Sequence, residues 1–369
     1  MGFIRFLLAC AVVLSHTSTI MGYSPVAGNL AVQCFYIISG FYMAMILTEK
    51  YNGPGANYQF YSNRALKIYP IYWLNLIVLI AWALIVYHLH YPGTLDFYIK
   101  YSNPGTFTLL YLFLANLLLI GLDWVFVLGI NKDGNLFFCS NFNAVKPSVY
   151  NFAFNSVAWT IGLELMFYLI APWLNKRTVY LLIILFLASL ALRFGLAYIY
   201  YDAAPWSYMF FPTQVMFFVA GILSYRAYIK FVKEKGNKKL QYMLYGVLLF
   251  VVLSYYKILP DSYTYLKQTI LFLSVACCLP FAFEATKKSK IDRFLGNLSY
   301  PIYISQVIVI KMVTINRFPK VIDKGFTALI MVIILALLVN KFVGEPIERY
   351  RTKRVQRFKH AEVTLAINQ

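Results

Sequence analysis

An arginine and a histidine interrupt the apolar stretch that opens the chain, FIRFLLACAVVLSHT (residues 3–17). Arg5 and His16 lie eleven residues apart, close to three helical turns, so both side chains should leave the same helix face. At 1.5 Å per residue, His16 should lie roughly 16 Å deeper than Arg5. A buried imidazole favours its neutral form, which can accept a proton. The pair therefore indicates a cation at the mouth of a cavity and a general base inside it.

Two simpler interpretations fit the same stretch. A positive charge before an apolar run also describes a signal peptide, but His16 interrupts the run, no convincing cleavage site follows, and a second apolar segment begins at once. A structural histidine bonded to a neighbouring helix is the other alternative. Ionisable residues inside a membrane are functional by default, which favours a role in chemistry.

Glu164 is the second candidate, because it lies about two turns from either end of the apolar stretch SVAWTIGLELMFYLIAP and is the most deeply embedded carboxylate of the sequence. Tyr168 follows one turn later on the same face, and Trp159 precedes it. A carboxylate at this depth is expensive and seldom idle, and it can orient an imidazole or act as acid or base. The structural alternative is an ion pair with a cation such as Arg193 in the next segment.

Other candidates have weaker individual signals. Arg64 and Lys67, one turn apart in YSNRALKIYPIYW, could bind phosphates together or simply anchor the helix at the membrane surface. The Ser39-Gly40 pair in FYIISGFYMA would admit a thin ligand or a neighbouring backbone, and alone it is a packing motif. FLGNLSYPIYISQ adds the polar side chains Ser299, Tyr300, Tyr303 and Gln306.

Histidines and cysteines give no support to a metal or disulfide framework. The chain has only four histidines, and its five cysteines follow no metal-binding spacing. His88 and His90 belong to the outer end of an apolar segment, where interfacial side chains are expected. We therefore expect no metal site.

Composition identifies the class of protein. Of 369 residues, 61% are hydrophobic and only 13% are charged, which is typical of a polytopic membrane protein. The formal charge of +19 could suggest nucleic-acid binding, but the basic residues lie in short loops between apolar runs. That distribution is typical of positive-inside topology, so we expect contacts with membrane lipids and none with nucleic acid.

Eleven apolar segments are candidate membrane spans. Basic residues concentrate in the loops 49–67, 226–239 and 284–296 and in the tail, all of which should face the cytosol. The segments are 3–21, 29–48, 68–88, 107–128, 156–174, 179–199, 207–225, 240–256, 267–283, 297–313 and 325–343.

The number of crossings indicates that one segment is incomplete. The loop near 89–106 should lie outside and residues 175–177 inside, yet two segments, 107–128 and 156–174, separate them. One of the two should therefore enter and return, which irregular backbone can do where it lines a polar cavity. We expect an all-α polytopic membrane protein with about ten transmembrane helices and one partial or re-entrant element around a central polar cavity.

The domain organisation is simple. Residues 1–345 should form one integral-membrane domain, and residues 346–369 a basic cytosolic tail that lies against anionic lipid headgroups. Both termini should be cytosolic. No internal repeat is detectable.

Together these pieces resemble the acyltransferase-3 family of integral-membrane O-acyltransferases. The resemblance includes Arg5 and His16 with ten residues between them and the basic pair before IYPIYW. It continues through ISGF, WTIGLELMFYLIAP, FFVAG, LGNLSYPIYIS and the closing GEP, in the family's order and over essentially the whole chain.

The resemblance implies transfer of an acyl group, usually acetyl from acetyl-CoA, to a hydroxyl. The usual acceptor is a cell-envelope polysaccharide such as O-antigen or exopolysaccharide, or its lipid-linked precursor, and the usual location is the bacterial inner (plasma) membrane. By resemblance His16 is catalytic, with Arg5 and Arg64 as essential partners. Glu164 has a supporting role.

The chain departs from the family pattern at two positions. Many members carry a histidine where this chain has Gln306, and glutamine cannot titrate. Lys67 replaces the family's second arginine, so the charge is kept but the bidentate fork is lost. Some members also carry a soluble hydrolase-like domain, which this chain lacks.

The residues support the same chemistry. Arg5, Arg64 and Lys67 would bind the phosphates of an acyl-CoA co-substrate, with no bound cofactor, and the pantetheine arm would pass Ser39 and Gly40. The thioester would then arrive near the histidine.

At that point His16 would act as general base on the acceptor hydroxyl, with Glu164 holding the imidazole tautomer directly or through water. An acyl-His16 intermediate is an open alternative. The side chains expected to line the cavity or position the acceptor are Trp159, Tyr168, Ser299, Tyr300, Tyr303 and Gln306.

A polytopic transporter of a small polar solute or saccharide is the alternative from another class, because a helix bundle with a polar centre also describes one. Transporters commonly contain structural repeats, and none is detectable here. A scaffold without catalysis would leave the matched depth of Arg5 and His16 unexplained.

Overall fold

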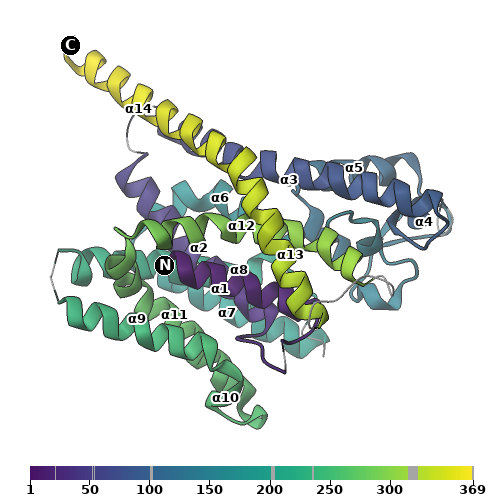
Figure 1. Cartoon of the computed structure of the whole chain (residues 1–369), viewed down its shortest axis with the longest axis horizontal. Coiled ribbons are helices and arrows are strands. Elements are labelled where there is room, and N and C mark those ends of the chain that lie inside the picture. The colour runs from purple at the N-terminus through teal and green to yellow at the C-terminus, as the bar shows by residue number, and fades with distance from the viewer. Residues whose placement is uncertain are drawn as a thin grey trace.

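The chain folds into a bundle of long helices that run side by side (Figure 1). The structure is a computed structural model that describes residues 1–367 except 21, 52, 54, 100–102, 201–203, 235–236 and 315–322; of residues 359–367 only the backbone is described. Within these residues the bundle consists of α1 (Gly2–Ser15), α2 (Gly28–Glu49), α3 (Ala56–His88), α6 (Trp159–Asn175), α7 (Val179–Tyr200), α8 (Phe211–Ala227), α9 (Lys238–Leu253), α11 (Thr264–Thr286), α12 (Lys290–Val313) and α13 (Lys324–Val339).

Shorter elements connect or extend these helices. They are α4 (Thr94–Ile99), α5 (Thr106–Leu118), α10 (Tyr255–Ile258), the two-stranded antiparallel hairpin β1 (Leu128–Ile130) and β2 (Leu136–Phe138), and α14 (Glu345–Ile367). Single-turn 3-10 or π segments are η1 (Leu122–Phe126), η2 (Phe142–Ala144), η3 (Val149–Phe152), η4 (Tyr228–Val232), η5 (Asp261–Tyr263) and η6 (Asn340–Gly344).

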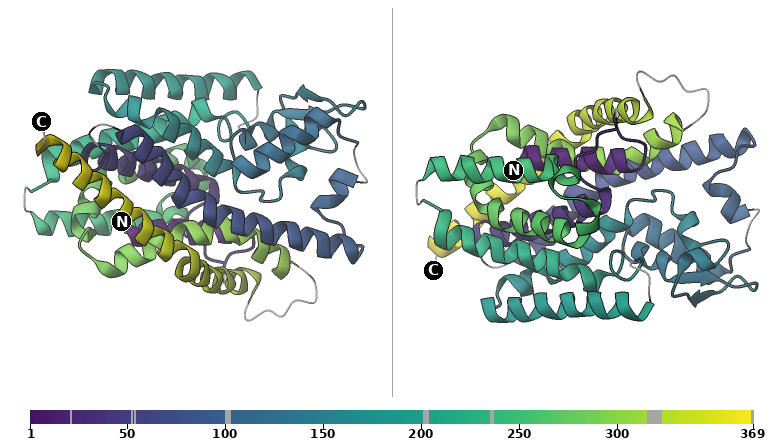
Figure 2. Two further views of the ribbon diagram at one scale, coloured as in Figure 1. Left: turned by 90° about the horizontal axis from the view of Figure 1, so that it is seen from above. Right: turned by 90° about the horizontal axis from the view of Figure 1, so that it is seen from below.

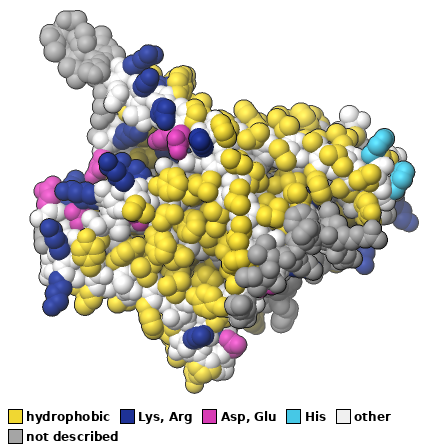
Figure 3. Space-filling model, in the orientation of Figure 1, with side chains coloured by type: hydrophobic (Ala, Val, Ile, Leu, Met, Phe, Trp, Pro, Cys, Tyr) yellow, Lys and Arg dark blue, Asp and Glu magenta, His cyan; other side chains and the backbone are white. Residues whose placement is uncertain are grey.

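The apolar surface and the helix lengths identify an integral membrane protein, as the composition predicts. Among the described residues, six helical stretches are long and apolar enough to cross a membrane. A broad hydrophobic band covers the middle of the molecule, while Lys and Arg side chains gather at one end and along α14 (Figure 3). We call the end of the bundle where α8 ends and α9 begins the basic end. The six stretches are Gly28–Glu49, Ala56–His88, Val179–Tyr200, Phe211–Val232, Asp261–Thr286 and Lys324–Phe358.

Helix α2 lies at the centre, packed against α1, α6 and α8, whereas α7 lies at the edge of the bundle and contacts α8 (Figure 2). The contact between α2 and α8 is unusually close. A Cβ atom added to Gly40 would lie 2.0 Å from the carbonyl oxygen of Phe218, and one added to Gly221 would lie 2.0 Å from that of Ile37. Small residues allow membrane helices to approach in this way, so Gly40 is a packing residue here.

Helix α5 is short, and the chain after it turns back, which is the shape expected of a partial element. Its last carbonyls accept hydrogen bonds from side chains in the middle of α3, at 2.7 Å from Tyr69 to Leu118 and at 3.0 Å from Trp73 to Leu117. The chain then turns back, and the hairpin returns to the start of α5, where Gly105 N donates to Gly134 O at 2.9 Å. Segment 107–128 therefore folds back on itself, whereas segment 156–174 contains the continuous helix α6.

Helix α1 is shorter than the predicted span 3–21, because it ends at Ser15. The hydroxyl of Ser15 donates to Val12 O at 2.7 Å, and that of Thr17 donates to Val13 O at 3.0 Å, which also accepts from His16 N at 3.2 Å. The next residues are fixed to α13 by a 2.9 Å hydrogen bond from Gly325 N to Ser18 Oγ.

Substituting Gly221 by alanine should destabilise the protein, because the new methyl group meets backbone that cannot move aside. The expected cost is about 1–3 kcal/mol, typical of overpacking. Gly246→Ala in α9 is the matched control, since nothing lies within 4 Å of its Cβ position. Thermal unfolding in detergent should give a lower Tm for the first variant only, and equal Tm values would contradict the close crossing.

Candidate functional site

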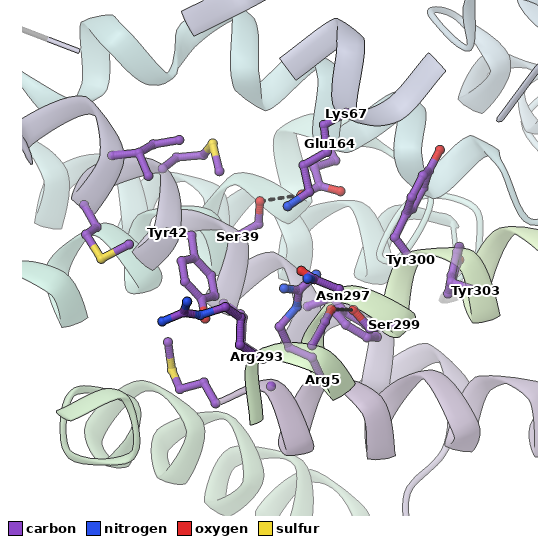
Figure 4. A pocket seen from close by; sticks show the side chains of 18 of the residues that line it. Arg5, Ser39, Tyr42, Lys67, Glu164, Arg293, Asn297, Ser299, Tyr300 and Tyr303 are labelled. Carbon is purple, nitrogen blue, oxygen red and sulfur yellow. Dashed lines mark hydrogen bonds between the residues drawn. The ribbon is translucent and has the colours of Figure 1, made fainter. Parts of the chain in front are cut away.

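A cavity of about 390 Å³ opens at the basic end of the bundle. Helices α1, α2, α3, α6, α12 and α14 all contribute to its wall, and Figure 4 shows side chains of α1, α2, α3, α6 and α12 converging there. Among the predicted site residues, the cavity lining includes Arg5, Ser39, Arg64, Lys67, Glu164, Tyr168, Ser299, Tyr300 and Tyr303. The structure therefore brings together nine residues that the sequence distributes over five segments.

Arg5 owes its position to the way in which α1 begins. The carboxylate of Asp292, near the start of α12, accepts hydrogen bonds from Gly2 N at 2.7 Å and from Phe3 N at 2.9 Å. A carboxylate on the first amides of a helix satisfies donors that have no partner within the helix. A Cβ on Gly2 would lie 1.6 Å from Asp292 O, so the two helices touch backbone to backbone. One turn later, the Arg5 guanidinium lies 5.7 Å from the ring centre of Tyr42.

Two hydroxyl groups hold Glu164, and no cation forms an ion pair with it in the described part of the chain. Ser39 Oγ donates to Glu164 Oε1 at 2.5 Å (Figure 4), and the Tyr168 hydroxyl donates to the same oxygen. Charge-assisted hydrogen bonds of this kind are about twice as strong as neutral ones. The structural alternative of an ion pair with Arg193 is not found, because Arg193 lies over the ring of Phe217 with a centroid distance of 5.6 Å.

Basic side chains exceed acidic ones around this cavity. Seven cations and three carboxylates line it, and one of the carboxylates, Asp292, is already bonded to the start of α1. The Arg64 guanidinium lies 6.0 Å from the ring centre of Tyr168, with its Nε bonded to no described residue. Excess positive charge in a concave, partly buried site favours an anionic ligand. The seven cations are Arg5, Lys50, Arg64, Lys67, Lys287, Arg293 and Arg351.

Hydroxyl groups line the inner part of the cavity. Thr160 Oγ1 and Tyr303 Oη share a 2.7 Å hydrogen bond, and Tyr36 Oη donates to Thr160 O at 3.5 Å. Tyr300 Oη donates to Ile68 O at 2.9 Å, which joins α12 to α3. The side chains named here are uncharged, so this part of the cavity suits a neutral group.

His16 does not line the cavity. It follows the last residue of α1, and its side chain is exposed, contrary to the expectation of a buried imidazole. The reason is the early end of α1, which leaves His16 on the connection to α2. No hydrogen bond joins His16 to Glu164 among the described residues, so the two do not form a pair in this structure.

Three further residues that were predicted for the cavity lie outside its lining. Gly40 faces the backbone of α8. Trp159 is buried against the rings of Phe126 and Tyr208. Gln306 is fully buried and donates to Tyr303 O at 2.8 Å, so it contacts the backbone of a cavity residue without lining the cavity itself. His88, which is exposed at the end of α3, does not line the cavity either.

Sequence reasoning missed several members of the site. Tyr36 and Thr160 lie one turn from Ser39 and Glu164 respectively, so helical spacing could have identified them. The more deeply buried carboxylates are Asp96 and Asp123, at 2% and 5% exposure, and not Glu164, which faces the cavity. Arg351 was assigned to the tail, and no sequence signal connected it with the cavity. No cluster of His, Cys, Asp and Glu among the described residues could hold a metal ion.

Comparison with known proteins identifies similar sequences. The family model of an acyltransferase domain matches residues 1–341. A protein of Rhizobium radiobacter named protein 2 in picA locus is 31% identical over 103 residues, which are 28% of this chain and 54% of that protein. The chain therefore matches about half the length of this relative. No solved structure matches the chain.

Removing the Tyr168 hydroxyl, which donates a hydrogen bond to the Glu164 carboxylate, should destabilise the folded protein. In Tyr168→Phe the carboxylate loses one charge-assisted hydrogen bond, worth about 1.5–3 kcal/mol, while the ring remains in place. Tyr150→Phe is the control, since its hydroxyl bonds to no described residue and only its ring packs, against Phe126 and Phe142. Thermal unfolding in detergent should show a decrease for Tyr168→Phe alone; similar Tm values would mean that this bond contributes little.

Proposed function

Because the chain belongs to the family defined by this acyltransferase domain, we propose that it moves an acyl group from a cytosolic acyl-CoA, usually acetyl-CoA, to a hydroxyl of a cell-surface polysaccharide or its lipid-linked precursor. The observation that carries the proposal is the cavity with seven cations near its opening and hydroxyl groups farther in. An acyl-CoA has the matching distribution, with phosphates at one end and a thin arm that ends in a thioester. The family match also favours an acyltransferase over a transporter.

The cations provide the electrostatic part of the mechanism. Arg5, Arg64 and Lys67 bind the phosphates, and Arg side chains can do so with two parallel hydrogen bonds. The arm then passes Ser39 towards the hydroxyls of Thr160 and Tyr303. Glu164 acts as a positioning residue, because its bonds to Ser39 and Tyr168 hold the side walls of this passage.

His16 is the proposed general base. Its imidazole takes the proton of the acceptor hydroxyl while that oxygen attacks the thioester carbonyl carbon; the carbon–sulfur bond then breaks, and the thiolate leaves as CoA and regains a proton. His16, which follows the last residue of α1, is eleven positions after Arg5, which corresponds to about 16 Å. The exposure of His16 supports access by a large acceptor, and the long, thin arm of the donor has to cover the distance from the cations.

The proposed orientation places the basic end in the cytosol of a bacterial inner membrane. The first turn of α1 lines a cavity together with Arg351 of α14, so the two terminal helices meet at the same end. Positive residues favour the cytosolic face, and acyl-CoA is supplied from that side. Both termini are therefore cytosolic in this proposal.

His16→Ala should lower the rate of acyl transfer by about 10²–10⁴-fold, the usual contribution of a general base. Binding of acetyl-CoA should be unchanged, since the phosphates contact other residues. The control is His88→Ala, which removes an exposed histidine at the end of α3. The measurement is transfer of labelled acetyl in membranes, together with analysis of the envelope glycans for one missing ester.

Transfer at the parental rate by a folded His16→Ala protein would rule out this role. If the rate falls instead, mass spectrometry of the parent protein quenched with donor alone separates direct transfer from a route through an acyl-His16 intermediate. An acyl group on His16 would indicate a covalent intermediate, and unmodified His16 would indicate direct transfer.

A further inference from the structure

The helix that follows the matched family domain supplies a side chain to the cavity. Arg351 belongs to α14, ten residues after the end of the match at residue 341. Its side chain is only 4% exposed, although its neighbours Arg349 and Tyr350 are exposed. Arg351 lines the main cavity and also a second one of about 420 Å³, which extends under α14 between α3 and α12. It therefore lies at the boundary between the two cavities.

Arg351 is incompletely satisfied in this position. One terminal nitrogen, NH1, contacts the carboxylate of Glu348 one turn earlier in α14, and Nε has no partner among the described residues. A buried donor without a partner costs free energy, and the cost is recovered when a ligand supplies an acceptor. Glu348 is half-exposed, and no second carboxylate among the described residues pairs with Arg351.

The surroundings add like charge. Lys67 lies within electrostatic reach of three other cations, Arg5, Arg64 and Arg351. It also lies within reach of the carboxylate of Glu348. Bringing four cations together is unfavourable unless an anion of more than one charge joins them. A phosphate or diphosphate meets this requirement, whereas a neutral sugar or a lipid chain does not.

We propose that Arg351 is a donor-binding residue that contacts a phosphate of the acyl-CoA from the side of α14, with Glu348 orienting its guanidinium. The proposal rests on the proposed function and adds a residue outside the matched domain to the phosphate site. It gives the first turns of α14 a role in selecting a donor that carries phosphates. It also explains why a side chain of the basic tail is buried while others on the same helix are exposed.

The test compares two donors in full-length protein. Acetyl-CoA carries the phosphates and acetyl-pantetheine does not, so the ratio of their KM values measures what the phosphate site contributes. Arg351→Ala should raise the KM for acetyl-CoA about ten- to a hundredfold, as expected for lost hydrogen bonds to a charged group, and leave the KM for acetyl-pantetheine unchanged. Arg351→Lys should lie between, because it keeps the charge and loses the planar fork.

Arg357→Ala is the matched control, because this arginine lies on the same helix, is exposed and lines neither cavity. An unchanged KM for acetyl-CoA in Arg351→Ala, or an equal rise for both donors, would overturn the proposal. If Arg351→Ala fails to fold, Arg351→Lys decides by the same ratio. Failure of the parent protein to transfer acetyl from either donor would instead contradict the proposed function itself.

Discussion

The carboxylate of Glu164 is the constraint on which the arrangement of the cavity depends. A charged group inside a helix bundle is tolerated only when donors surround it, and here they come from Ser39 on α2 and Tyr168 on α6. These bonds fix how α2 and α6 are rotated and shifted relative to each other. Since Arg64 of α3 lies over the Tyr168 ring, the same group also determines where the first cations of the mouth are held.

Close packing around α2 makes this arrangement rigid. Gly40 and Gly221 allow α2 and α8 to touch along their backbones, so the face of α2 that carries Ser39 has little freedom to rotate. On the other side, Asp292 fixes the start of α1 to α12. The cations of the cavity therefore stay close to one another at the cost of mutual repulsion. Positive charge concentrated in a concave, partly buried site favours an anionic ligand.

The sequence predicted the fold class and much of the site, for physical reasons that are easy to state. Apolar length and basic loops determine a membrane bundle, and the parity of crossings predicts one partial element, for which the short helix α5 has a suitable shape. Arg5, Arg64 and Glu164 could be predicted because a charge in or beside an apolar helix has few explanations other than a cavity. Their convergence is confirmed by the structure.

Other features depend on contacts between segments that a single sequence does not contain. Gly40 was read with Ser39 as a ligand passage, but consecutive helical residues point about 100° apart, and only Ser39 faces the cavity. The early end of α1 depends on local hydroxyl bonds of Ser15 and Thr17, which an apolar pattern does not reveal. Arg351 was missed because the path of α14 over the cavity is set by its continuity with α13 and not by its own composition.

Helix α1 acts as a spacer within the proposed reaction. Its start is fixed by hydrogen bonds to Asp292. Its end packs closely against the start of α2, because a Cβ on Gly28 would lie 2.1 Å from Ser15 Oγ. Just beyond that end, Ser18 Oγ accepts a hydrogen bond from Gly325 N. A helix held at both ends changes length very little, so the separation of about 16 Å between the levels of Arg5 and His16 is constant. A donor anchored by its phosphates would present its thioester at a depth set by the length of its arm. In the proposed reaction the distance along α1 would therefore select for arm length, and the cations would select for charge.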